Sequence, residues 1–120
     1  MLLINLVTVP NIDVNIVDID GCTTIHLAAV KGDEDVVELL LTVNRTDVNV
    51  PNSYGWTALH SATYYGHRDV VELLVNVANS DLNAITMNGE TLLLLAQENG
   101  QVDIVDILKK FLNGDAKDFD

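Results

Sequence analysis

Residues 47–80 read DVNVPNSYGWTALHSATYYGHRDVVELLVNVANS, and residues 13–46 before them read DVNIVDIDGCTTIHLAAVKGDEDVVELLLTVNRT. The two stretches are identical at 15 of their 34 positions. A third stretch, residues 81–114, begins DLNAITMNGETLLLLAQENG and keeps the framework more loosely. The starting residues Asp13, Asp47 and Asp81 are therefore 34 residues apart (47 − 13 and 81 − 47). Self-similarity at a fixed period of this length predicts stacked structural repeats.

Each repeat has the same local order, which the second repeat illustrates. Residues 52–55 are polar and end in a glycine, which suits a turn that needs a positive φ. Thr57 can cap a short apolar helix, and Gly66 can end that helix in a left-handed conformation. Asp69 favours the start of a second helix, whose apolar face comes from the run VVELL. One such helix pair cannot bury its own apolar faces, so we predict three stacked pairs.

These motifs resemble the ankyrin repeat family. The family pattern DxxGxTPLHLAA is visible at residues 18–29 and 52–63, and DVVELL follows it in both repeats. The resemblance covers roughly residues 13–112. It implies an all-α solenoid in which each repeat supplies a hairpin-like turn and two antiparallel helices. It also implies a protein–protein interaction module that binds through a concave face formed by the turn tips and first helices.

We expect one domain with five parts. Residues 1–12 form a partial leading repeat, the remnant of a second helix, and 13–46, 47–80 and 81–114 form three repeats, the last of them like a C-terminal cap. Residues 115–120 form an acidic tail. Because this leading segment supplies only a second helix, we expect the N-terminal end of the stack to be under-covered. The alternative function is therefore a structural fragment of a longer array, or a stack that self-associates at that end.

Composition limits the choice of partner. Six Lys and Arg residues stand against 18 Asp and Glu residues, for a formal net charge of −12. Nucleic acid and anionic membranes need a basic footprint, so we expect another protein as the partner. The single cysteine, Cys22, allows no internal disulfide and fits a reducing compartment. We therefore expect an intracellular, cytoplasmic protein, with the nucleus as the alternative.

The histidines are the first candidates for catalysis or metal binding. His26 and His60 recur one repeat apart in the same slot, and the family resemblance implies that this histidine braces neighbouring turns through hydrogen bonds. We interpret both as structural, because zinc needs several ligands in compact spacing. His67 follows a glycine at a loop, where we expect it to be exposed without a second ligand.

The remaining chemical motifs are weak. Asp18 and Asp20 match only part of a calcium loop, which also needs a closing Glu. The resemblance raises hydroxylation of Asn49 and Asn83, although a structural loop role is the simpler interpretation. No nucleophile–base set or phosphate loop appears, so we expect neither an enzyme nor a cofactor, and a small-molecule binder ranks last.

The aromatic residues point to the binding surface. In the family, partner contacts come from residues around the turn glycine and from the two residues before the helix-ending glycine. In repeat two these slots hold all three tyrosines and the only tryptophan of the chain: Ser53, Tyr54, Trp56, Tyr64 and Tyr65. The flanking repeats contribute Ile19, Cys22, Lys31, Met87 and Glu90 from the same slots. Tyr and Trp often dominate interface energies near the centre of an interface, so we predict this surface as the partner site. Among these rings, we expect Tyr64 to be the one partly packed in the core.

Overall fold

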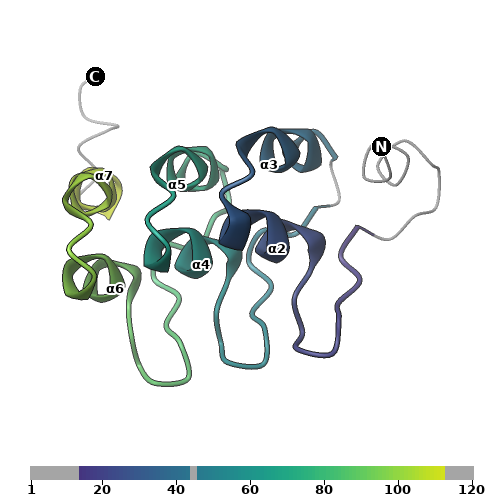
Figure 1. Cartoon of the computed structure of the whole chain (residues 1–120), viewed down its shortest axis with the longest axis horizontal. Helices are drawn as coiled ribbons and strands as arrows, with labels where there is room; N and C mark the ends of the chain where they lie inside the picture. The colour runs from purple at the N-terminus through teal and green to yellow at the C-terminus, as the bar shows by residue number, and fades with distance from the viewer. Residues whose placement is uncertain (1–13, 44–45, 113–120) are drawn as a thin grey trace.

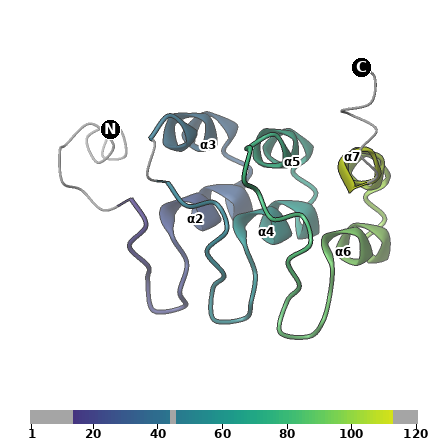
Figure 2. The ribbon, with the colours of Figure 1, turned by 180° about the vertical axis from the view of Figure 1, so that it is seen from behind.

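The computed structural model describes residues 14–43 and 46–112, which fold into six helices in two layers (Figure 1). The first helices of the repeats form one layer: α2 (Thr24–Lys31), α4 (Ala58–Tyr64) and α6 (Leu92–Glu98). The second helices form the other layer: α3 (Glu34–Leu41), α5 (Arg68–Val75) and α7 (Val102–Leu112). A long loop precedes each pair and projects beyond the first-helix layer, as the view from behind also shows (Figure 2). The expected all-α solenoid is therefore confirmed, whereas the expected leading segment 1–12 and tail 115–120 lie outside the described residues.

The ends of the first helices form as the threonine and glycine pattern predicts. Thr57 lies just before α4 in an extended conformation, with φ −85° and ψ 172°, and its hydroxyl accepts a hydrogen bond from the backbone N–H of His60. The His60 ring in turn accepts one from the backbone N–H of Thr57, which makes a reciprocal cap. After the helix, Gly66 adopts φ +75°, a conformation that a side chain would disfavour.

The core runs along the stack between the two helix layers. Its clearest members are Leu40, Leu74 and Leu108, which recur one repeat apart and are each at most 1% exposed. In α5 the buried residues are Val70, Val71, Leu74 and Val75. The VVELL run supplies the first three of them, whereas its Leu73 is only half-buried. Since α5 packs against α3 and α7 as well as α4, each repeat covers the apolar face of its neighbour.

The loop tips are joined by backbone hydrogen bonds. Within repeat two, the N–H of Gly55 donates to the carbonyl of Asn52 at 2.9 Å and closes the turn. Between repeats, the N–H of Ser53 donates to the carbonyl of Asp20 at 2.9 Å, and the N–H of Met87 donates to the carbonyl of Tyr54 at 3.0 Å. The three tips therefore form one continuous edge of the molecule.

The loops between repeats are also linked, by asparagine side chains. Asn49 Oδ1 accepts the backbone N–H of Asp81 at 2.8 Å, while its Nδ2 donates to the carbonyl of Asn79 at 2.8 Å. Asn15 Oδ1 accepts the N–H of Asp47 in the same way, one repeat earlier. These bonds give Asn49 the structural role that the sequence favours.

Candidate functional site

Asn52 fixes the position of the two ring residues in the loop of repeat two. Its Oδ1 accepts the backbone N–H groups of Tyr54 at 2.9 Å and Trp56 at 3.0 Å, and its Nδ2 donates to Cys22 Sγ at 3.6 Å. The carbonyl of Trp56 is held as well, because it lies 2.9 Å from Nε2 of His26. Tyr54 and Trp56 are thus carried by a loop that is bonded both within itself and to repeat one.

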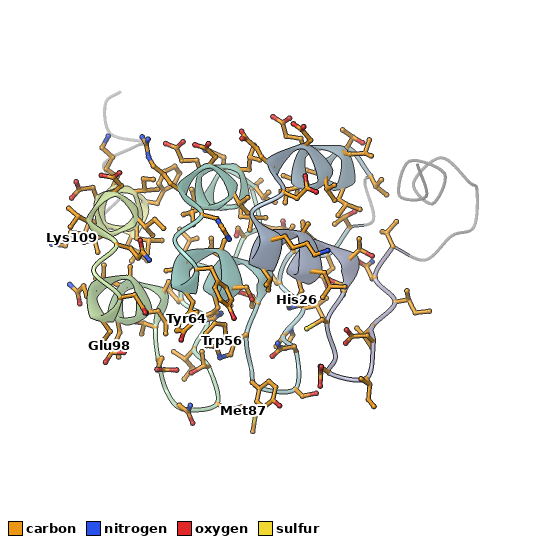
Figure 3. All side chains as sticks on the ribbon, in the orientation of Figure 1. His26, Trp56, Tyr64, Met87, Glu98 and Lys109 are labelled. Carbon is orange, nitrogen blue, oxygen red and sulfur yellow. The ribbon has the colours of Figure 1, made fainter. Side chains whose placement is uncertain are left out.

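The aromatic side chains of repeat two form a row from the loop to the end of α4. The rings of Trp56 and Tyr64 meet edge to face with centroids 5.2 Å apart, and those of Tyr64 and Tyr65 do so at 4.9 Å. Tyr65 stacks on His67 with centroids 6.4 Å apart. Figure 3 shows Trp56 and Tyr64 together on the loop side of α4. Such ring pairs stabilise packing, so these contacts hold the row in place.

A hollow of about 380 Å³ opens beside this row, between the loop tips and the first helices. We call it the aromatic hollow, and its lining residues are Val30, Asn52, Tyr54, Trp56, Ser61, Tyr65 and Asn88. Its size falls at the lower end of the range of ligand and anchor-residue pockets. Three of the predicted site residues, Tyr54, Trp56 and Tyr65, therefore share one concave surface.

The other predicted residues lie around this surface with different exposures. Ile19 and Met87, at the tips of the neighbouring loops, are 97% and 76% exposed, and Ser53 and Lys31 are also exposed. Cys22 and Glu90 are half-buried: Cys22 accepts the bond from Asn52, and Glu90 Oε1 accepts one from Thr86 Oγ1 at 3.1 Å.

Two expectations about packing need correction. Tyr64 is the ring expected to be partly core, yet Trp56, which packs edge to face with it, is the less exposed of the two. His67, expected to be exposed, is half-buried: its Nε2 lies 2.9 Å from the carbonyl of Val30, and its ring packs over Gly32. His67 therefore links repeat two to the end of α2.

Asn52 and Ser61 also line the hollow, although they are not among the site residues predicted from the sequence. The 34-residue period could have indicated Ser61, because its slot holds Leu27 in repeat one and Leu95 in repeat three. Because serine is smaller than leucine, Ser61 leaves space on its side of α4 that a leucine in this slot would fill. In the structure this space is part of the aromatic hollow.

His26 and His60 are both buried, one in each of two successive repeats, and each hydrogen-bonds its own repeat to the next one. These bonds give both rings a structural role. Nδ1 of each accepts the backbone N–H of the threonine three residues earlier, at 3.0 Å. Nε2 must then carry the proton and donate to the next repeat, to the carbonyl of Trp56 or Ala84. Burial lowers the pKa of both rings, since a charged imidazole would lose hydration. Within the described ranges, no group of three or more His, Cys, Asp or Glu residues could hold a metal ion.

This pKa shift predicts a loss of stability in mild acid. Because the pKa of each folded ring lies below the unfolded value of about 6.5, the unfolded chain binds more protons as the pH falls past that value. We expect each histidine to remove at most about 1.4 kcal/mol of stability between pH 7.5 and pH 5.5. Urea unfolding at the two pH values measures this. A His26→Gln/His60→Gln variant, which cannot titrate at these positions, should show a flatter pH profile, and an unchanged profile would contradict the assignment.

Comparison with known proteins agrees with this architecture. A family model described as ankyrin repeats, in three copies, matches residues 2–86. The match covers more than half of the chain, so the protein belongs to the ankyrin repeat family. Helices α6 and α7 continue the same packing beyond the match. No curated protein matches the chain. In the described part of the chain, no helix is long and apolar enough to cross a membrane.

Proposed function

We propose that the chain is a non-enzymatic protein-binding module whose partner site is centred on repeat two. Ankyrin repeats generally act as protein–protein interaction modules. The observation that supports this particular surface is the gathering of Tyr54, Trp56 and Tyr65 around one hollow. The equivalent slots of the other repeats hold no aromatic residue. Exposed rings grouped at the centre of a concave face have the composition and placement of interface hot spots.

The loop tips extend the proposed site on both sides. Ile19, Tyr54 and Met87 are exposed apolar or aromatic side chains on successive tips, and the ring of Tyr54 is 62% exposed. The hydrogen bonds between the tips hold these side chains at fixed spacing. A surface that is ordered beforehand loses less conformational entropy on binding, which favours affinity.

Replacing Trp56 and Tyr65 with alanine should weaken partner binding strongly. Each truncation should cost on the order of 2 kcal/mol if these rings are hot spots. Affinity capture from the source cell, with wild type and the double variant as baits, identifies the partners that depend on the surface, and titration of each gives the loss. Cooperative unfolding of the variant must be retained. Tyr54→Ala provides a second variant, because that ring is 62% exposed and its truncation should disturb the fold less.

Val102→Ala is the matched control for this experiment. Val102 is 69% exposed on α7 and lies in the second-helix layer, so its truncation removes apolar surface away from the hollow. We expect no change in affinity for Val102→Ala. Equal affinity of wild type and the Trp56→Ala/Tyr65→Ala variant for every captured partner would exclude this surface.

The exposure of Leu27 in α2 favours the alternative of self-association. Leu27 is 46% exposed, whereas the residues in its slot in the other repeats, Ser61 and Leu95, are buried. An apolar side chain in a slot that is covered elsewhere in the stack favours contact with another copy. Light scattering across protein concentration distinguishes the two functions, since a constant monomer mass would exclude self-association.

A further inference from the structure

We infer that the aromatic hollow receives an arginine side chain, presented by an extended segment of the partner protein. The inference rests on the proposed function and names the chemistry of its partner. It is carried by three features of the described residues: the rings that line the hollow, the acceptor atoms among them, and the negative charge around them.

The lining of the hollow suits a flat cation. It contains the rings of Tyr54, Trp56 and Tyr65 and, apart from these, only neutral residues. The face of an aromatic ring attracts a cation, and tryptophan does so most strongly. A guanidinium group is planar and less strongly hydrated than an ammonium group, so it can stack on a ring while its methylene stem covers apolar surface. Arginine therefore matches this lining better than lysine.

The hollow also offers hydrogen-bond acceptors that folding leaves unused. In the described part of the chain, the hydroxyl of Ser61 and the side-chain amide of Asn88 make no hydrogen bond, although both groups line the hollow. The amide of Asn52 is different, because its oxygen and nitrogen are already engaged. A guanidinium has five N–H donors and no acceptor, so the free oxygens of Ser61 and Asn88 complement it.

Carboxylates flank the hollow on the neighbouring repeats. Asp20 lies on the loop of repeat one, in the slot that holds Tyr54 in repeat two. Glu90 and Glu98 lie in repeat three, in the slots of Trp56 and Tyr64, and Figure 3 shows Glu98 on α6. Together with the formal net charge of −12, these groups attract a basic segment and repel an acidic one.

Few basic residues in the described part of the chain lie near enough to offset this negative charge. Lys31 is the only Lys or Arg on the described loops and first helices. Arg68 lies in α5 and pairs with Glu72 at 3.7 Å, and Lys109 and Lys110 lie in α7. No arginine of the described chain thus reaches the hollow from within, and a partner must supply it.

Selection of peptides from a randomised twelve-residue library, displayed on phage and panned against the whole chain, tests the inference. We expect selected peptides to share one arginine. In a synthetic copy of the best peptide, replacing that arginine with citrulline, which has nearly the same shape but no charge, should weaken binding about tenfold or more. The peptide with lysine at the same position should lie between the two.

Two variants locate the effect in the hollow. Ser61→Leu fills the hollow with the residue that its slot carries in the other repeats and leaves every ring in place, so binding and the preference for arginine over citrulline should both be lost. Tyr54→Ala, on an exposed ring, should weaken both if Ser61→Leu fails to fold. Glu98→Gln should weaken binding more than Asp106→Asn, which makes the same change of charge on α7.

The outcomes separate this inference from the proposed function. Peptides that need Trp56 and Tyr65 but bind equally well with citrulline would overturn the arginine inference and leave the binding surface intact. Peptides that are indifferent to Trp56, Tyr65 and Ser61 would contradict both, as would a selection that yields no binder.

Discussion

Gly55→Ala should lower the free energy of unfolding by about 3 kcal/mol, whereas Gly89→Ala should lower it by only about 1 kcal/mol. The two glycines occupy the same slot of successive repeats and share φ +78°. A side chain in this left-handed conformation is strained equally at both positions. The remaining difference comes from what the new methyl group meets.

At Gly55 the added Cβ would lie 2.7 Å from the backbone nitrogen of Met87, whereas at Gly89 it would meet nothing within 4 Å. Relief of that overlap must move the loop of repeat three and break the hydrogen bond from Met87 to the carbonyl of Tyr54. Urea denaturation of both variants measures the difference. Gly21→Ala should fall between them, because its Cβ would lie 3.1 Å from the nitrogen of Ser53.

The same substitution should also affect the proposed site, because Gly55 lies between Tyr54 and Trp56. A shift of the loop changes the spacing of two rings that line the hollow, so Gly55→Ala should weaken partner binding while Gly89→Ala does not. Equal losses of stability in Gly55→Ala and Gly89→Ala would show that the loop tips do not pack against each other. The inference that the three tips form one ordered edge would then be wrong.

Periodicity accounts for most of what the sequence predicts correctly. Thr57, His60 and Gly66 each have counterparts one repeat away, because helix caps and turns need particular side chains at fixed places in every repeat. The helix order and the structural role of the histidines follow directly from this regularity. The family resemblance also implies a binding face at the loop tips, and that role stays a prediction.

The details of the site depend on departures from periodicity. Trp56 is less exposed than Tyr64, and the two rings pack edge to face in a geometry that no spacing rule specifies. His67 is half-buried because Gly32, one repeat away, leaves room for its ring. Ser61 leaves room for the hollow because it is smaller than Leu27 and Leu95, which occupy its slot in the other repeats. The volumes of side chains in neighbouring repeats thus decide which residues line the hollow. The family pattern does not specify these volumes.

His60→Leu should destabilise the chain by about 3 kcal/mol even though the new side chain is apolar and of similar size. His60 is fully buried, and its ring accepts the backbone N–H of Thr57 and lies 3.2 Å from the carbonyl of Ala84. Leucine would leave that buried N–H and the carbonyl without partners, each at a cost of about 1–3 kcal/mol. Because leucine and histidine are similar in size, lost packing contributes little to this destabilisation. The measured cost therefore reflects the lost hydrogen bonds.

The third repeat provides the control for this prediction. Leu94 occupies the slot of His60 and is 39% exposed, and Thr91 beside it is exposed too. Leu94→His should therefore change stability by less than about 0.5 kcal/mol, since it neither orphans nor satisfies a buried group. Urea denaturation at pH 7.5 keeps the imidazole neutral in both variants. Similar costs for His60→Leu and Leu94→His would contradict the role of His60 as a brace between repeats. A large cost for His60→Leu alone would show that the histidine slot stabilises the stack only where another repeat follows and supplies the carbonyl.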